Sequence, residues 1–157
     1  MSLRDEKGDC PLFGEPGMKA DESALEEATA LLRSATTRIA VVGASNDPSK
    51  YGNIIVKNLM AHGYQVLPVN PKETTIAGLP AFRSLADVPQ PVHIVDVVTP
   101  PAVTRQVLKN ASDVGIGLVW LQDGSFDQAV IDAAAAAPFK TVHDACIMVV
   151  ARQVARP

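Results

Sequence analysis

One stretch of the sequence, residues 38–53, limits the fold more than any other. Residues 39–42 form a short apolar run rich in β-branched side chains, and three small residues, 43–45, follow it directly. The length and branching of the run favour a fully buried strand over a helix. A polar loop with Pro48 and an apolar periodicity typical of a helix come next. Because a strand, a small-residue turn and a helix aim backbone N–H groups at one point, we expect the turn to bind phosphate.

The rest of the chain alternates strand and helix patterns. Further strands are expected over 65–69, 92–98 and 117–121, with a fifth opening at 141–142, and helices over 22–34, 51–62, 99–115 and 125–137. Residues 147–150 either continue the fifth strand or form a closing helix. This alternation predicts an α/β fold, a Rossmann-like, doubly wound, mainly parallel five-stranded sheet in three layers.

Local signals set the expected helix ends. Capping boxes are expected at Ser23 with Glu26 and at Ser125 with Gln128, and Thr99 is expected to cap the helix that Pro100 and Pro101 open. Met60 and Val103 fall at apolar-periodic positions and are expected to face the core. Residues 70–91 are expected to form a long loop with one helical turn at 84–88.

Composition narrows the class of protein. The 157 residues suit one domain, which we place at 36–157 after an irregular tail over 1–21 and an N-terminal helix over 22–35. The net charge of −3 shows no excess of basic residues of the kind that binds nucleic acid, and no apolar run is long enough to span a membrane. The N-terminus lacks a signal-peptide pattern, and Cys10 and Cys146 show no framework spacing, so we expect a cytoplasmic protein. The three histidines form no zinc pattern. A homodimer stays open.

Parallel sheets bind ligands beyond the carboxyl ends of their strands, at the point where the strand order reverses. Five segments should meet there, although they are far apart in sequence. They are residues 43–52, 70–72, 99–101, 122–124 and 143–146.

The residues in these segments restrict the phosphate ligand. The second glycine of a dinucleotide fingerprint is missing, and the strand over 65–69 is followed by Asn70 and Lys72 instead of an acid. A cation there favours a ribose that carries its own phosphate, as in NADP or coenzyme A, although one lysine on a loop also fits a solvated charge. The sequence has neither the Gly-Lys-Ser/Thr ending of a P-loop nor the G-x-S-x-G motif of serine hydrolases.

Several motifs together resemble the CoA-binding domain family in its small single-domain form. They are VVGASNDP at 41–48, KYG at 50–52, GYQVLPVNP at 63–71, GLPAF at 78–82, WLQDG at 120–124 and DAC at 144–146. A similar domain forms the N-terminal part of the α subunit of succinyl-CoA synthetase. Two positions depart from the family: residues 98–101 carry no arginine, and Ala145 stands where an arginine often precedes the cysteine.

The resemblance implies a role for each site residue. Gly43, Ala44 and Ser45 would meet the diphosphate with Lys50 and Tyr51 beside them. Asn70, Pro71 and Lys72 would face the ribose and its 3′-phosphate. Thr99, Pro100 and Pro101 would form a wall against adenine, and Gln122 and Gly124 would line the pantetheine arm.

The leading hypothesis is therefore a nucleotide-binding protein that binds CoA or acyl-CoA without catalysis, because no pair of residues in the sequence can be identified as a base and its nucleophile. The alternatives are a small NADP-binding protein or oxidoreductase fragment, and an interaction module that binds no ligand. A metal or nucleophile at His143, Asp144 and Cys146 has little support, and Trp120 is expected in the core. Cys146 is expected to be a buried small residue, and a sharper hypothesis places it where it forms a mixed disulfide with CoA.

Overall fold

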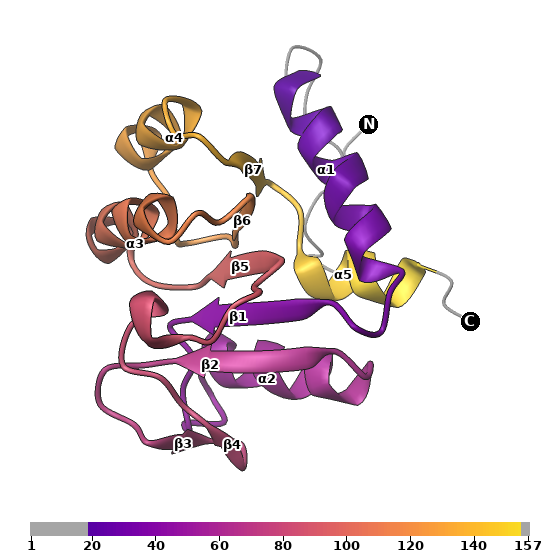
Figure 1. The fold of residues 1–157 in the computed structure, drawn as a ribbon, viewed down its shortest axis with the longest axis vertical. Coiled ribbons are helices and arrows are strands. Elements are labelled where there is room, and N and C mark those ends of the chain that lie inside the picture. The colour runs from indigo at the N-terminus through magenta and orange to yellow at the C-terminus, as the bar shows by residue number, and fades with distance from the viewer. Residues whose placement is uncertain (1–18, 155–157) are drawn as a thin grey trace.

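The computed structural model describes residues 19–154 as a sheet of five parallel strands covered by helices on both faces (Figure 1). The strands are β1 (Arg38–Val42), β2 (Gln65–Val69), β5 (Ile94–Val97), β6 (Leu118–Leu121) and β7 (Lys140–His143). The helices are α1 (Lys19–Leu32), α2 (Tyr51–Ala61), α3 (Pro101–Asp113), α4 (Gln128–Ala135) and α5 (Ile147–Gln153). The predicted α/β fold class is confirmed.

The strand order is β2-β1-β5-β6-β7, and every pair in this sheet is parallel. The chain moves outward from β1 to β2 and then crosses back to pair β5 with the other side of β1. The order of the strands therefore reverses between β1 and β5, and a doubly wound sheet binds its ligand at this switch point.

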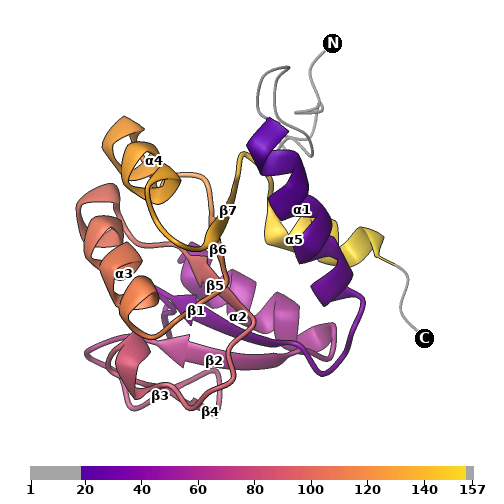
Figure 2. The same ribbon diagram turned by 45° about the horizontal axis from the view of Figure 1, so that its top comes forward.

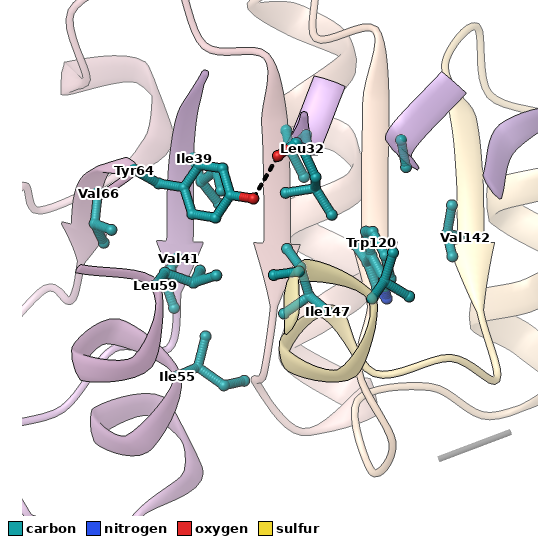
Figure 3. Close-up of a cluster of buried hydrophobic side chains, with 14 of the residues drawn as sticks. Leu32, Ile39, Val41, Ile55, Leu59, Tyr64, Val66, Trp120, Val142 and Ile147 are labelled. Carbon is teal, nitrogen blue, oxygen red and sulfur yellow. Dashed lines mark hydrogen bonds between the residues drawn. The ribbon is translucent and has the colours of Figure 1, made fainter. Parts of the chain in front are cut away.

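Two apolar clusters hold the three layers together. Helices α1, α2 and α5 cover one face of the sheet, and α3 and α4 cover the other (Figure 2). Figure 3 shows the first cluster, in which Ile55 of α2 and Ile147 of α5 pack on the face of the sheet that carries Trp120. In the same cluster the Tyr64 hydroxyl donates to the carbonyl of Leu32. Trp120 is fully buried, as expected for the core. Met60 and Val103 are 36% and 48% exposed, so the prediction that they face the core was wrong.

A short hairpin lies in the segment that was expected to be an irregular loop. Strands β3 (Thr75–Ile76) and β4 (Leu79–Pro80) pair antiparallel across Ala77 and Gly78, whose φ angles are 52° and 83°. Two positive φ angles in a two-residue turn match the twist of a hairpin. The strands are too short to leave an alternating pattern in the sequence. The predicted helical turn is confirmed as the 3₁₀ helix η1 (Leu85–Asp87).

The predicted helix caps at Ser23, Thr99 and Ser125 were wrong. Helix α1 begins at Lys19, inside the predicted tail, so Ser23 lies within it; residues 1–18 are outside the described part. The caps of α3 and α4 are Pro100 and Asp127 instead. The two hydroxyls have other partners: that of Thr99 bonds the hydroxyl of Thr104, and that of Ser125 donates to the carbonyl of Gln122.

The remaining bounds agree within a few residues. Strands β1 and β2 and helix α2 lie where the sequence places them. Strand β5 is shorter than predicted, and α4 ends two residues earlier. Residues 147–150 belong to α5, which resolves the alternative in favour of a closing helix. The helices of the described region are all too short or too polar to cross a membrane.

Candidate functional site

The parallel register brings the five predicted segments to one edge of the sheet. Val42 pairs with both Val69 and Val97, Val97 pairs with Leu121, and Leu121 pairs with His143. Each of the five segments begins at, or within two residues of, one member of this row. The row therefore confirms that residues distant in sequence share the carboxyl edge of the sheet.

Two glycines shape the turn after β1, because neither position has room for a side chain. Gly43 has a φ of 98°, and a Cβ atom on it would lie 2.7 Å from Cγ2 of Val98. A Cβ atom on Gly52, the second residue of α2, would lie 2.1 Å from the carbonyl oxygen of Gly43. The first turn of α2 therefore packs directly on the backbone of this turn, as in phosphate-binding βαβ units.

Two asparagine side chains orient the next two peptide groups. Nδ2 of Asn70 donates to the carbonyl of Ala44 at 2.8 Å, and Nδ2 of Asn53 donates to the carbonyl of Ser45 at 2.9 Å. The N–H of a trans peptide points opposite to its C=O, so the N–H groups of Ser45 and Asn46 face away from the two amides. Neither N–H has an acceptor within the described residues. The turn thus presents two oriented donors, an arrangement suited to a phosphate oxygen.

Exposed charges flank these donors. Lys50 precedes α2, and Lys72 follows β2 with its N–H bonded to Oδ1 of Asn70 at 2.7 Å. The side chain that orients Ala44 therefore also fixes the backbone of Lys72. The pKa of Asp47 lies below its usual value, because its carboxylate accepts hydrogen bonds from Ser49, of which the bond from the backbone N–H has the larger effect. Asp47 is therefore a carboxylate and offsets part of the positive charge beside the turn.

The β3–β4 hairpin is attached to the same loop through Asn46. Its Nδ2 donates to Oε1 of Glu73 at 3.0 Å and to the carbonyl of Thr75 at 2.7 Å. Its Oδ1 accepts from the N–H of Ala77 at 3.3 Å. Three hydrogen bonds of one side chain thus connect the hairpin, and Glu73 just before it, to the turn after β1.

The other wall of the switch point is formed by the start of α3. Pro100 is exposed, Pro101 is the first helical residue, and the exposed side chain of Val103 lies within the first turn of the helix. Thr99 is partly buried, and its hydroxyl is bonded to that of Thr104 at 2.8 Å. This wall is apolar, as a surface against adenine requires, and the adenine contact itself stays a prediction.

A buried polar network lies farther along the same edge. Gln122 is fully buried; its Oε1 accepts from the N–H of Ile147 at 3.1 Å, and its Nε2 donates to the hydroxyl of Tyr51 at 3.3 Å. That hydroxyl also lies 3.1 Å from Sγ of Cys146, which is buried as expected. Gln122 therefore joins α2 to α5, and its predicted contact with pantetheine stays a prediction. Gly124 is exposed, with a φ of 89°.

Asp96 lies beneath this network, in the middle of β5. It is fully buried, and neither carboxylate oxygen has a hydrogen-bond partner within the described residues. Burial, and then the charge of Cys146, raise the pKa of Asp96 well above its usual value. Buried polar groups without partners are rare, and they concentrate at functional sites.

His143 and Asp144 form a pair at the end of β7, with Nδ1 of the imidazole 2.7 Å from Oδ2 of the carboxylate. Within the described residues, at this pair and elsewhere, there is no group of three His, Cys, Asp or Glu side chains that could hold a metal ion.

Comparison with known proteins agrees with this geometry. The family model described as CoA binding domain matches residues 37–152, which is most of the chain. The chain belongs to the CoA-binding domain family.

Relatives of this CoA-binding domain occur both as small proteins and inside larger enzymes. It is 38% identical over 88 residues to the α subunit of ADP-forming acetate–CoA ligase II from Pyrococcus furiosus; the match covers 55% of this chain and 19% of that subunit. A conserved hypothetical protein from Pyrococcus furiosus has a TM-score of 0.70 at 41% identity, covering 72% of this chain and 97% of that one. A Thermus thermophilus protein has a TM-score of 0.73 at 36% identity, covering 83% and 98%. The chain thus spans about a fifth of the ligase subunit and nearly all of the two small proteins.

Sequence reasoning missed several residues that build the site of this CoA-binding domain. Asn53 looks like an ordinary polar position of α2, and Asn46 like a loop residue, yet their amides hold the turn after β1 and the hairpin. Asp96 interrupts a β-branched run, and that interruption is the one signal that could have found it. Asn70, predicted to face the ribose, has both ends of its amide bonded to protein backbone and acts here as a positioning residue.

Proposed function

We propose that this domain binds coenzyme A or an acyl-CoA without catalysing a reaction, in the cytoplasm. The observation that carries the proposal is the pair of N–H donors at Ser45 and Asn46, which Asn70 and Asn53 orient. The first turn of α2 packs through Gly52 against the carbonyl of Gly43 in the same turn, so the partial positive charge at the helix N-terminus acts beside these donors. A diphosphate fits this combination of donors and field.

Lys72 supports CoA as the particular diphosphate. Its backbone is fixed by the side chain that orients the turn, and its exposed ammonium stands past the end of β2. A ribose that carries a 3′-phosphate offers such a cation a second dianionic group. The exposed Pro100 and the half-exposed Val103 offer an apolar surface for the adenine.

Calorimetric titration with CoA, dephospho-CoA and NADPH tests the proposal. Binding of CoA, with dephospho-CoA about tenfold weaker, is expected if Lys72 pairs with the 3′-phosphate. Binding of NADPH in preference to CoA would support the oxidoreductase alternative, for which Lys72 is equally suited. Heat from none of the three ligands would support an interaction module.

A further inference from the structure

A cleft of about 290 Å³ lies between α4 and β7, on the face of the sheet opposite α1 and α5. Helix α4 and strand β7 lie side by side at this edge of the sheet (Figure 1). The cleft has apolar walls and three polar lining residues, Lys140, Thr141 and His143; the walls are formed by Ile131, Ala134, Ala135 and Phe139. Strand β7 is the last strand of the sheet, so α4 alone covers this part of its surface.

One polar atom in the cleft has no partner. Oγ1 of Thr141 is buried and makes no hydrogen bond within the described residues. A buried hydroxyl without a partner is costly, and such groups call for an explanation. The oxygen is enclosed by protein atoms, so a ligand in the cleft reaches it only when the Thr141 side chain rotates toward the cleft. A ligand with one hydrogen-bonding atom in mainly apolar surroundings would then satisfy it.

The cleft has a structured end at the carboxyl edge of the sheet. His143 is the last residue of β7, and its Nδ1 lies 2.7 Å from the Asp144 carboxylate, which fixes the direction of the imidazole. Asp144 has a φ of 63°, a left-handed conformation that a residue with a side chain rarely adopts. The ring of Phe126 packs against the imidazole, with 5.4 Å between ring centroids. The end of the cleft is therefore held by specific contacts.

The His143 end of the cleft lies a few strand spacings from the turn after β1, where we propose that the diphosphate binds. The path from β1 across β5 and β6 to β7 is three strand spacings, about 14 Å. A pantetheine arm that starts at a diphosphate on the turn is long enough to cross this width, and its sulfur then reaches the end of β7. An acyl group on that sulfur would meet His143 first and the apolar walls next.

We infer that the cleft between α4 and β7 binds the acyl group of an acyl-CoA, and that Thr141 selects acyl groups that carry an oxygen atom. The inference rests on the proposed CoA site and names its ligand class. Thr141 lies two residues before His143, about 7 Å deeper along the strand. The preferred acyl group is therefore mainly apolar, with its hydrogen-bonding atom several bonds from the thioester.

Titration with CoA, benzoyl-CoA and 4-hydroxybenzoyl-CoA tests this inference, because the two acyl groups differ by one hydroxyl. The chain as it stands is expected to bind benzoyl-CoA about tenfold more tightly than CoA, through burial of the ring. The hydroxyl should add about a further fivefold by satisfying Thr141. Thr141→Val should remove only this second preference. Ala135→Trp should fill the cleft and remove both preferences, with the affinity for CoA unchanged.

Ala133→Trp is the matched control, because Ala133 is an exposed alanine of α4 that does not line the cleft. It should leave all three affinities as they are. Equal affinities for CoA and both acyl-CoAs, or acyl preferences that persist in Ala135→Trp, would overturn the inference and leave the CoA site standing. Failure of all three ligands to bind would instead overturn the proposed CoA site, and the inference with it.

Discussion

The turn after β1 and the buried network around Asp96 lie along the same edge of the sheet, but their polar groups are placed in opposite environments. In the turn, asparagine amides bond the carbonyls of Ala44 and Ser45, which leaves the N–H groups oriented and available. At Asp96 a carboxyl group is fully buried and neither oxygen has a partner within the described residues. The first region is preorganised to accept an anion, and the second excludes a negative charge. The turn, and not the interior beside it, is therefore the place that we propose for a phosphate.

The largest effect is expected where the turn and α2 touch. Gly52→Ala places a Cβ atom against the carbonyl oxygen of Gly43, 2.1 Å away, so the helix or the turn must move. We expect loss of measurable CoA binding in calorimetry, and a free energy of unfolding lower by about 1–3 kcal/mol in chemical denaturation. Gly117→Ala is the control, because a Cβ atom there meets nothing within 4 Å. A Gly52→Ala variant that binds CoA normally would show that this contact does not shape the site.

The next effect tests whether the amide of Asn53 orients the turn. Asn53→Asp keeps the shape of the side chain but replaces the donor to the Ser45 carbonyl, at 2.9 Å, by a carboxylate oxygen. Because two acceptors then face each other in a buried place, we expect the peptide to rotate and the CoA affinity to fall by about 1–3 kcal/mol. The loss should be seen in titration at a temperature where circular dichroism shows the variant to be folded.

Gln65→Glu is the matched exchange at the exposed end of β2, and we expect it to leave CoA affinity unchanged. Normal CoA binding by Asn53→Asp would mean that other contacts position the N–H groups.

The same contrast explains what could be predicted from the sequence. Strands β1 and β2 and helix α2 follow from local patterns, because apolar periodicity and the stop at Gly63 act over a few residues. The contacts that build the turn join residues 8 and 26 positions apart, and no local pattern records them. The wrong caps at Thr99 and Ser125 have a different origin, since each hydroxyl bonds a nearby residue in place of the first helical N–H groups. The motifs of the site could be found by resemblance, whereas the amides that support them could not.

A smaller effect, dependent on pH, is expected at Asp96. Burial, then the charge of Cys146, raise its pKa above the usual 3.8, so the folded protein holds this proton more tightly than the unfolded chain does. The associated stabilisation is complete below the unfolded pKa and is lost as the pH rises through the folded one. In that window the free energy of unfolding should fall by up to about 1.4 kcal/mol per pH unit. Asp96→Asn should remove this fall, as followed by urea denaturation across pH.

Asp113→Asn, at an exposed residue near the end of α3, is the control and should keep the pH dependence of the original chain. The same fall in Asp96→Asn as in the original chain would show that another group titrates, and the contrast between the two regions would then be lost.

The smallest effect is expected at Lys72, which is exposed and therefore screened by salt. Lys72→Ala should weaken CoA binding by about 1–2 kcal/mol at low ionic strength and leave dephospho-CoA binding unchanged. Lys109→Ala, an exposed lysine in the body of α3, controls for the loss of one charge from the surface. If Lys72→Ala weakens CoA and dephospho-CoA equally, the ammonium acts on the diphosphate through the general field of the turn. Selection of a phosphorylated ribose must then come from another group at the carboxyl edge of β2.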